Sequence, residues 1–164
     1  APIVTATKST TTRAPLTTNN AVTCSIGFEV RKQIHEWNTI SAKILSSYMD
    51  MSIPVDQVVS DFENLNPQLT RVVSQMHSLE DCLPTHERSF FTPFLATYDD
   101  KLSGYSALEN SMRIDSTELE KTALQMLTDA NSASFGMICA IAEFLDEKLP
   151  GAELCINTVE ATNE

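Results

Sequence analysis

Four stretches of this chain place apolar residues three and four positions apart, and short breaks separate them. The breaks are marked by Pro54, by Pro84 and by a turn near Asp115. Residues at that spacing fall on one face of an α-helix, because the helix makes a turn about every 3.6 residues. The pattern therefore predicts four amphipathic helices and an all-α fold.

The helix limits follow from capping and stop signals. The first helix is predicted over about 23–51, and Thr23 or Ser25 is its candidate cap. The second begins at Pro54, where a missing N–H costs nothing, and ends near Cys82. We call the row of apolar residues on one face of a helix its stripe. The stripe of the second helix starts at Val55, and the stripe of the first helix ends at Met51. Asn66-Pro67 predicts either one bent helix or two short ones.

The third helix is predicted to begin after Pro84, with Thr85 as its cap and a kink at Pro93. The fourth has the clearest start, because Asp115 and Glu118 resemble a capping box. A stop signal follows it at 148–151.

Short connections between long amphipathic helices favour antiparallel neighbours. We therefore expect an up-down-up-down four-helix bundle over residues 22–156, with kinked second and third helices. Residues 1–21 are rich in Thr, Ser and Pro and lack any apolar period, so they predict a disordered arm. Thr clustered near Pro also suits O-linked sugars in a secreted chain. Residues 157–164 are expected to form a flexible acidic tail.

The start at Ala1-Pro2 is typical of a mature chain from which a signal peptide has been removed. The four cysteines are Cys24, Cys82, Cys139 and Cys155. In the predicted bundle all four fall toward one end, which favours two disulfides and a secreted, extracellular protein. Cys24 would pair with Cys155 or with Cys139, and the other two would pair together. The alternative is four buried free thiols in a cytosolic protein.

The charge limits the classes of partner. The chain of 164 residues has a net charge of −11, and its first twenty residues contain no acidic residue. The body is therefore strongly acidic, repels phosphate backbones and predicts no nucleic-acid partner. No stretch has the length and hydrophobicity of a membrane span. Acidity of this kind serves solubility, or it attracts a basic patch on a partner.

Signals for catalysis, metals or cofactors are absent from the sequence. His35, His77 and His86 are isolated from one another, and surface or capping roles are predicted for them. No GxSxG, SxxK or Gly-rich phosphate loop occurs. Asp61 with Glu63, and Asp99 with Asp100, are the candidate acid pairs, but solvated helix faces explain them.

These observations predict a non-catalytic secreted protein that binds an extracellular protein partner, as a signal, an inhibitor or an immunomodulator. The alternative is an extracellular carrier of a hydrophobic small molecule or lipid in the bundle core, because Met and aromatic side chains can line an adaptable cavity. Its candidate lining residues are Trp37, Met76, Phe91, Phe94, Tyr98, Met126 and Met137. An ordinary packed core is the other interpretation of the same residues.

Overall fold

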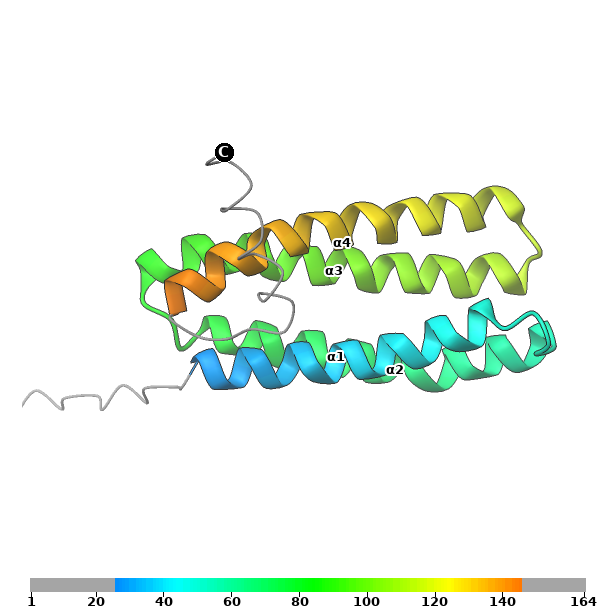
Figure 1. The fold of residues 1–164 in the computed structure, drawn as a ribbon, viewed down its shortest axis with the longest axis horizontal. Coiled ribbons are helices and arrows are strands. Elements are labelled where there is room, and N and C mark those ends of the chain that lie inside the picture. Colours follow the sequence, from blue (N-terminus) through cyan, green and yellow to red (C-terminus); the bar gives the residue numbers. More distant parts are fainter. Residues whose placement is uncertain (1–25, 146–164) are drawn as a thin grey trace, which may run out of the picture.

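A computed structural model describes residues 26–145 of the chain, and they form four α-helices (Figure 1). The helices are α1 (Ile26–Met49), α2 (Val55–Glu80), α3 (Thr85–Arg113) and α4 (Thr117–Leu145). No strand occurs within residues 26–145, so the all-α prediction is confirmed. The predicted arm at 1–21 and tail at 157–164 lie outside the described residues.

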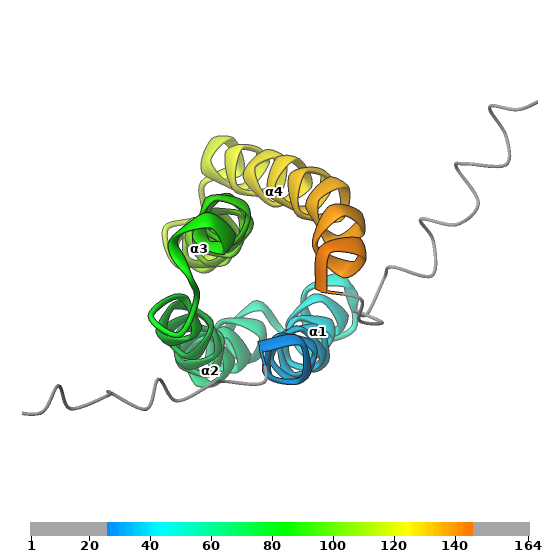
Figure 2. The same cartoon turned by 90° about the vertical axis from the view of Figure 1, so that its left-hand side faces the viewer.

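Consecutive helices run in opposite directions and pack side by side, α1 on α2, α2 on α3 and α3 on α4 (Figures 1 and 2). Seen along the bundle, the helices follow one another around a ring, and α4 slants from α3 toward α1 (Figure 2). We call the end with the α1–α2 and α3–α4 connections the distal end, and the end with the α2–α3 connection the proximal end. The structure is thus a four-helix bundle.

The core is built from the predicted stripes. Trp37 of α1 lies at its centre, with its ring centroid 5.2 Å from that of Tyr98 in a T-shaped contact. Phe94 continues the cluster, 5.2 Å from Tyr98. The other fully enclosed side chains are Val30, Ile34, Ile44, Phe62, Leu69, Val72, Met76, Leu95 and Leu108. Burial of this apolar surface is the main force that holds the helices together.

Two predicted stripe ends prove wrong, and both lie at the distal end. Met51 is fully exposed because α1 already ends at Met49 and residues 50–54 form the connection. Val55 is exposed as the first residue of α2. The spacing of apolar residues extends a stripe to the predicted end of the helix. It does not show that residues in or next to a connection are left uncovered by the neighbouring helices.

The predicted cap of α3 is also wrong. Thr85 is the first residue of α3, and Pro84 occupies the cap position without a side-chain hydrogen bond. The predicted caps Thr23 and Ser25 lie outside the described residues. Both α2 and α3 continue through their internal prolines, Pro67 and Pro93, so the alternative of two short segments for the second helix is wrong.

The connection from α3 to α4 corrects the capping-box prediction. Asp115 has a φ of 52°, and the Ser116 N–H donates to Ser111 O at 2.9 Å while the Asp115 N–H donates to Met112 O at 3.4 Å. These bonds form a Schellman motif that ends α3, with Asp115 in the place that glycine usually takes. An N-cap needs an extended backbone, so Ser116 caps α4 instead, and its Oγ accepts the Leu119 N–H at 3.3 Å.

Candidate functional site

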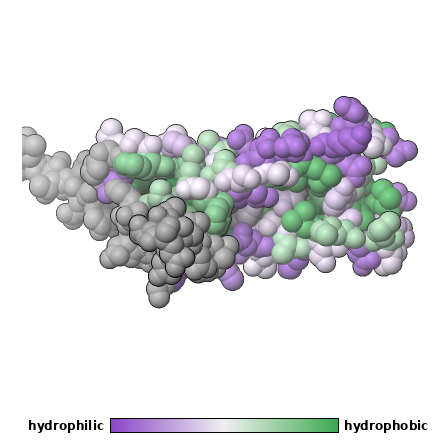
Figure 3. Space-filling view, turned by 45° about the horizontal axis from the view of Figure 1, so that its top comes forward, coloured by the Kyte–Doolittle hydropathy of each residue, from purple (hydrophilic) through white to green (hydrophobic). Residues whose placement is uncertain are grey.

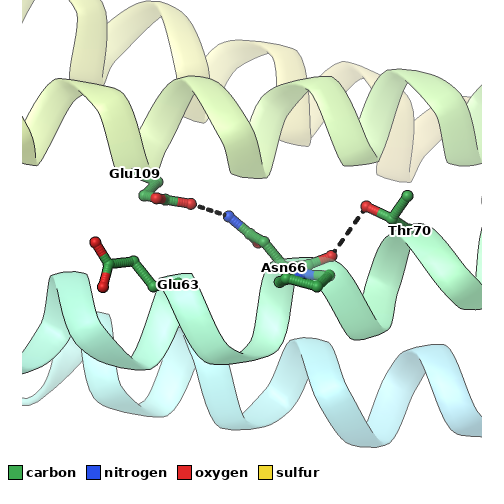
Figure 4. A pocket seen from close by; sticks show the side chains of 5 residues that line it. Glu63, Asn66, Thr70 and Glu109 are labelled. Carbon is green, nitrogen blue, oxygen red and sulfur yellow. Dashed lines mark hydrogen bonds between the residues drawn. The ribbon is translucent and has the colours of Figure 1, made fainter.

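The most unusual polar arrangement lies between α2 and α3, in a hollow of about 430 Å³ (Figure 4). Its lining residues are Glu63, Asn66, Pro67 and Thr70 of α2 and Glu109 of α3. The hollow adjoins the one turn of α2 that contains a proline. It therefore joins two carboxylates to an irregular stretch of helix backbone. We call it the Asn66 hollow.

Asn66 is 93% buried, and its side chain points from α2 toward α3 (Figure 4). Its Nδ2 donates to Glu109 Oε2 at 2.6 Å. Its Oδ1 is buried without a hydrogen-bond partner. An unpaired buried amide oxygen costs about 1–3 kcal/mol, because it has lost water and gained no donor. A buried polar atom without a partner calls for an explanation, and a donor from a bound water or a ligand would supply one.

Pro67 removes a backbone donor from the same turn. Proline has no N–H, so the carbonyl of Glu63 loses the helix hydrogen bond that residue 67 would donate. Thr70 Oγ1 donates to the carbonyl of Asn66 at 3.1 Å and reinforces the next turn (Figure 4). The helix stays continuous, and the turn at Pro67 has one backbone hydrogen bond fewer than a regular α-helix.

Arg113, the last residue of α3, spans the two carboxylates of the hollow. Its Nη2 binds Glu63 on α2 and donates to Glu109 Oε1 at 2.7 Å, and its Nε donates to the same oxygen at 3.1 Å. These bonds, first with Glu109 and then with Glu63, raise the pKa of the Arg113 guanidinium. A guanidinium from the protein itself therefore already engages the carboxylates of the Asn66 hollow.

A second hollow of about 340 Å³ continues from the first toward the distal end, and both are lined by Glu63. Its apolar lining comes from Val55, Val59 and Met112, and Arg113 lies on its wall. The two hollows meet at Glu63 and form one groove along α2 and α3, and its distal part is mostly polar because Asp56, Ser60 and Arg113 line it beside the apolar side chains.

The distal end carries exposed large apolar side chains. Met51 is 100% exposed, Met49 73%, Ile114 61% and Val55 59%. All four belong to the ends of α1 and α3, the start of α2 and the connections between helices. Figure 3 shows hydrophobic surface at this right-hand end, interrupted by polar residues. Clustered exposed apolar side chains of this kind mark interaction sites in soluble proteins.

The candidate lining residues of a carrier cavity lie mostly in the packed core. Trp37, Met76, Phe91, Phe94 and Tyr98 are each at most 3% exposed and belong to one apolar cluster. Met137 is half-buried and packs against that cluster. Met126 instead lines a hollow of about 320 Å³ on the α3–α4 face, with Asp100 and Asp129. The structure therefore does not bring the seven residues around one described hollow.

Of the four cysteines, the structure describes Cys82 and Cys139. Cys82 lies between α2 and α3 at the proximal end, and Cys139 lies near the end of α4, which reaches the same end of the bundle (Figure 1). Neither is a free thiol. Cys24 and Cys155 lie outside the described residues, so the disulfide pairings stay a prediction.

The two candidate acid pairs, which were expected to be side chains on solvated helix faces, do not form as pairs. Asp61 accepts a hydrogen bond from Ser47 Oγ of α1 at 2.5 Å and another from Gln57 at 3.0 Å. Its predicted companion Glu63 faces Arg113 instead. Asp99 binds His77 rather than Asp100. Within residues 26–145, no cluster of three or more His, Cys, Asp or Glu side chains is suited to a metal ion.

His77 joins α2 to α3 near the proximal end. Its Nε2 lies 2.9 Å from Asp99 Oδ2 and its Nδ1 lies 3.4 Å from Glu80 Oε2. These acidic partners, Asp99 first, raise the pKa of the imidazole above its usual range.

We expect this ion pair to stabilise the fold only while His77 is protonated. A raised folded-state pKa contributes its full stability below the unfolded value near 6.5, and the contribution is lost as the pH rises through the folded value. The pair is partly exposed, so His77→Gln should cost less than about 1 kcal/mol at pH 5, and the cost should be smaller at pH 8. Urea unfolding of both proteins at the two pH values measures this. An equal cost at both values would contradict the ion pair.

The sequence did not predict the Asn66 hollow. Asn66-Pro67 was expected only to bend or divide the second helix, and Glu63 was expected on a solvated helix face. The missed signal is spacing, because Phe62, Asn66, Leu69, Val73 and Met76 alternate steps of four and three. An amide in that series predicts a polar group facing the core.

Comparisons with known proteins add no name to this site. No family model matches the chain, and no curated protein and no solved structure matches it.

Proposed function

We propose that this chain is a non-catalytic, secreted protein that binds an extracellular protein partner through the distal end and the α2–α3 groove. The observation that carries the proposal is the continuity of exposed apolar side chains at the distal end with the acidic Asn66 hollow. An apolar centre bordered by polar groups is the usual composition of a protein interface.

Charge supports a basic partner. The net charge of −11 attracts a cationic surface from a distance and speeds its encounter with the bundle. Short-range affinity would then come from the apolar side chains of the distal end, because burial of apolar surface gives most of the binding energy. A bend of α2 at Pro67, the kink expected from the sequence, would hold the groove open.

Secretion, the two disulfides and sugars on the arm belong to the same proposal. Cys82 and Cys139 lie toward the proximal end, away from the proposed binding surface. Disulfides there would tie the ends of the helices without restricting the distal end. An extracellular signal, inhibitor or immunomodulator of this type requires a stable scaffold with one free face.

The carrier alternative has less support. Five of its seven candidate lining residues fill the core at most 3% exposed, which leaves them in contact with one another. A carrier would have to open the bundle before a lipid reached these side chains.

Within residues 26–145, no helix has the length and hydrophobicity needed to cross a membrane.

The test uses the labelled full chain on an array of purified extracellular receptor domains and proteases. We expect a partner whose affinity falls about tenfold or more in Ile114→Asp, because a central apolar contact is worth about 2 kcal/mol. Phe28→Asp is the matched control, since Phe28 is also exposed but lies on the first turns of α1 at the proximal end. Absence of any bound domain, together with a lipid that copurifies in native mass spectrometry, would overturn the proposal in favour of a carrier.

A further inference from the structure

We propose that the Asn66 hollow is a binding site for an arginine side chain of the partner. The inference rests on the proposed function and names the chemistry that the groove recognises. Glu63 and Glu109 would carry the charge, and the Asn66 amide oxygen would gain the donor that it lacks in the free protein.

The acceptors define the ligand. The hollow is lined by the carboxylates of Glu63 and Glu109, and the unpaired Asn66 Oδ1 lies buried in its wall; all of these accept hydrogen bonds. A complementary ligand must therefore be positive and must offer several donors. Guanidinium offers five N–H donors in a rigid plane and suits paired carboxylates.

Arg113 shows that the two carboxylates accept this group. A single guanidinium Nη2 bonds to both Glu63 and Glu109, although these residues come from different helices. The carboxylates are therefore already spaced for a guanidinium. The two carboxylates supply at most four oxygen atoms, one of which already accepts from Asn66 Nδ2, whereas a calcium ion takes about six to eight oxygen ligands.

Arg113 then acts as an internal competitor. Its ion pairs with Glu63 and Glu109 are partly exposed, with 42% of the Arg113 side chain, 48% of Glu63 and 18% of Glu109 open to solvent. Exposed ion pairs contribute little to the stability of a fold. A partner arginine that makes further contacts in the groove can therefore displace Arg113. Once Glu109 is released from Arg113, the Asn66 amide can turn outward and offer Oδ1 to the incoming donor.

The experiment titrates the ¹⁵N-labelled full chain with N-acetyl-arginine-N-methylamide and follows the Asn66 side-chain amide by NMR. N-acetyl-citrulline-N-methylamide is the matched probe, because it keeps the shape of arginine without its charge. We expect the arginine probe, and not the citrulline probe, to shift the Asn66 amide. Equal shifts from both probes would overturn the proposal, and so would a larger shift from calcium chloride alone.

Two variants separate the site from general electrostatics. Arg113→Gln removes the competitor and should tighten binding of the arginine probe about fivefold, the equivalent of one exposed ion pair. Arg71→Gln is the matched control, because Arg71 also joins two helices through an exposed ion pair, with Glu36 of α1. It should leave the affinity unchanged. Equal tightening in both variants, or none in Arg113→Gln, would contradict the assignment.

Asn66→Leu tests the amide itself. It removes the unpaired oxygen while keeping a side chain of similar size, so the chain should unfold at the same or a higher urea concentration. Binding of the arginine probe should weaken about tenfold, the cost of one charge-assisted hydrogen bond. Unchanged affinity in this variant would show that Asn66 is only structural.

The outcomes keep the two proposals apart. If the arginine probe binds but no receptor domain does, the arginine site in the Asn66 hollow is supported and the proposed function is wrong. If a receptor domain binds with the same affinity to Arg113→Gln and Asn66→Leu, the proposed function stands and the arginine site is wrong.

Discussion

Lys101→Met is expected to raise the free energy of unfolding by about 2 kcal/mol at pH 7. Lys101 lies on the inner side of α3 and is 6% exposed. Burial lowers the pKa of its ammonium from 10.5 to about 8, so holding the charged form in the fold costs about 3 kcal/mol. A cation–π contact returns part of that cost, because Nζ lies 4.3 Å from the Tyr98 ring centroid. Methionine keeps the length of the side chain and removes the charge.

The sign of the pH dependence gives an independent check. Because the folded-state pKa is lowered, the unfolded chain binds the proton more tightly between pH 8 and pH 10.5. The free energy of unfolding of the wild type should therefore rise by about 1 kcal/mol from pH 7 to pH 9. Measurements stop there because burial raises the pKa of Tyr98, whose ionisation in the unfolded chain then opposes folding. Lys101→Met should remove this rise.

Lys43→Met is the matched control, because Lys43 lies on the exposed face of α1. It should change the free energy of unfolding by less than about 0.5 kcal/mol. Urea unfolding at both pH values, followed by circular dichroism, measures all three proteins. A Lys101→Met protein that is less stable than the wild type would mean that the cation–π contact outweighs the cost of burial.

Lys101 also shows where the helical periodicity misleads. Leu102, the apolar neighbour of Lys101, is only half-buried, whereas Lys101 is buried. Steps of three and four from Tyr98 through Lys101 to Tyr105 and Leu108 describe the observed face better. A hydropathy pattern does not predict a lysine on the buried face of a helix. The packing accepts it because its long apolar stem lies along the core.

The four helices themselves were predictable from sequence, because their stripes span many turns. Val30, Ile34, Trp37 and Ile44 define one face of α1 without ambiguity, and all four are buried. Helix ends were less predictable. Asp115 and Ser116 both have capping side chains, and only the φ of 52° at Asp115 decides which of them caps α4.

The Asn66 hollow was only partly predictable. Asn66-Pro67 was recognised as an interruption, and the hollow does lie at that turn. The partnership of Asn66 with Glu109 joins residues 43 positions apart on different helices. It depends on how α2 is rotated against α3, and a single sequence does not report that rotation. The contact of Arg113 with Glu63 depends on the same rotation of α2 against α3.

Gly104→Ala is expected to lower the free energy of unfolding by about 1–2 kcal/mol, although alanine favours helix over glycine by about 1 kcal/mol. A Cβ at Gly104 would lie 2.8 Å from both Cγ and Cδ2 of Leu127 on α4. Cγ is the branch point of that side chain, and Leu127 is buried, so it has little space into which to move. The clash therefore outweighs the gain in helix propensity.

Gly136→Ala is expected to raise the free energy of unfolding. Comparison of the two variants therefore isolates the contact between residue 104 and Leu127. Gly136 lies inside α4, and within residues 26–145 no atom outside its own stretch of helix backbone lies within 4 Å of the Cβ that alanine would add. Only helix propensity remains, and this variant should gain about 0.5–1 kcal/mol. Leu127→Ala in the Gly104→Ala background should then recover part of the loss, because it removes the atoms that clash. If Gly104→Ala stabilised the protein as much as Gly136→Ala does, α3 and α4 would have to lie farther apart at residue 104 than the structure places them.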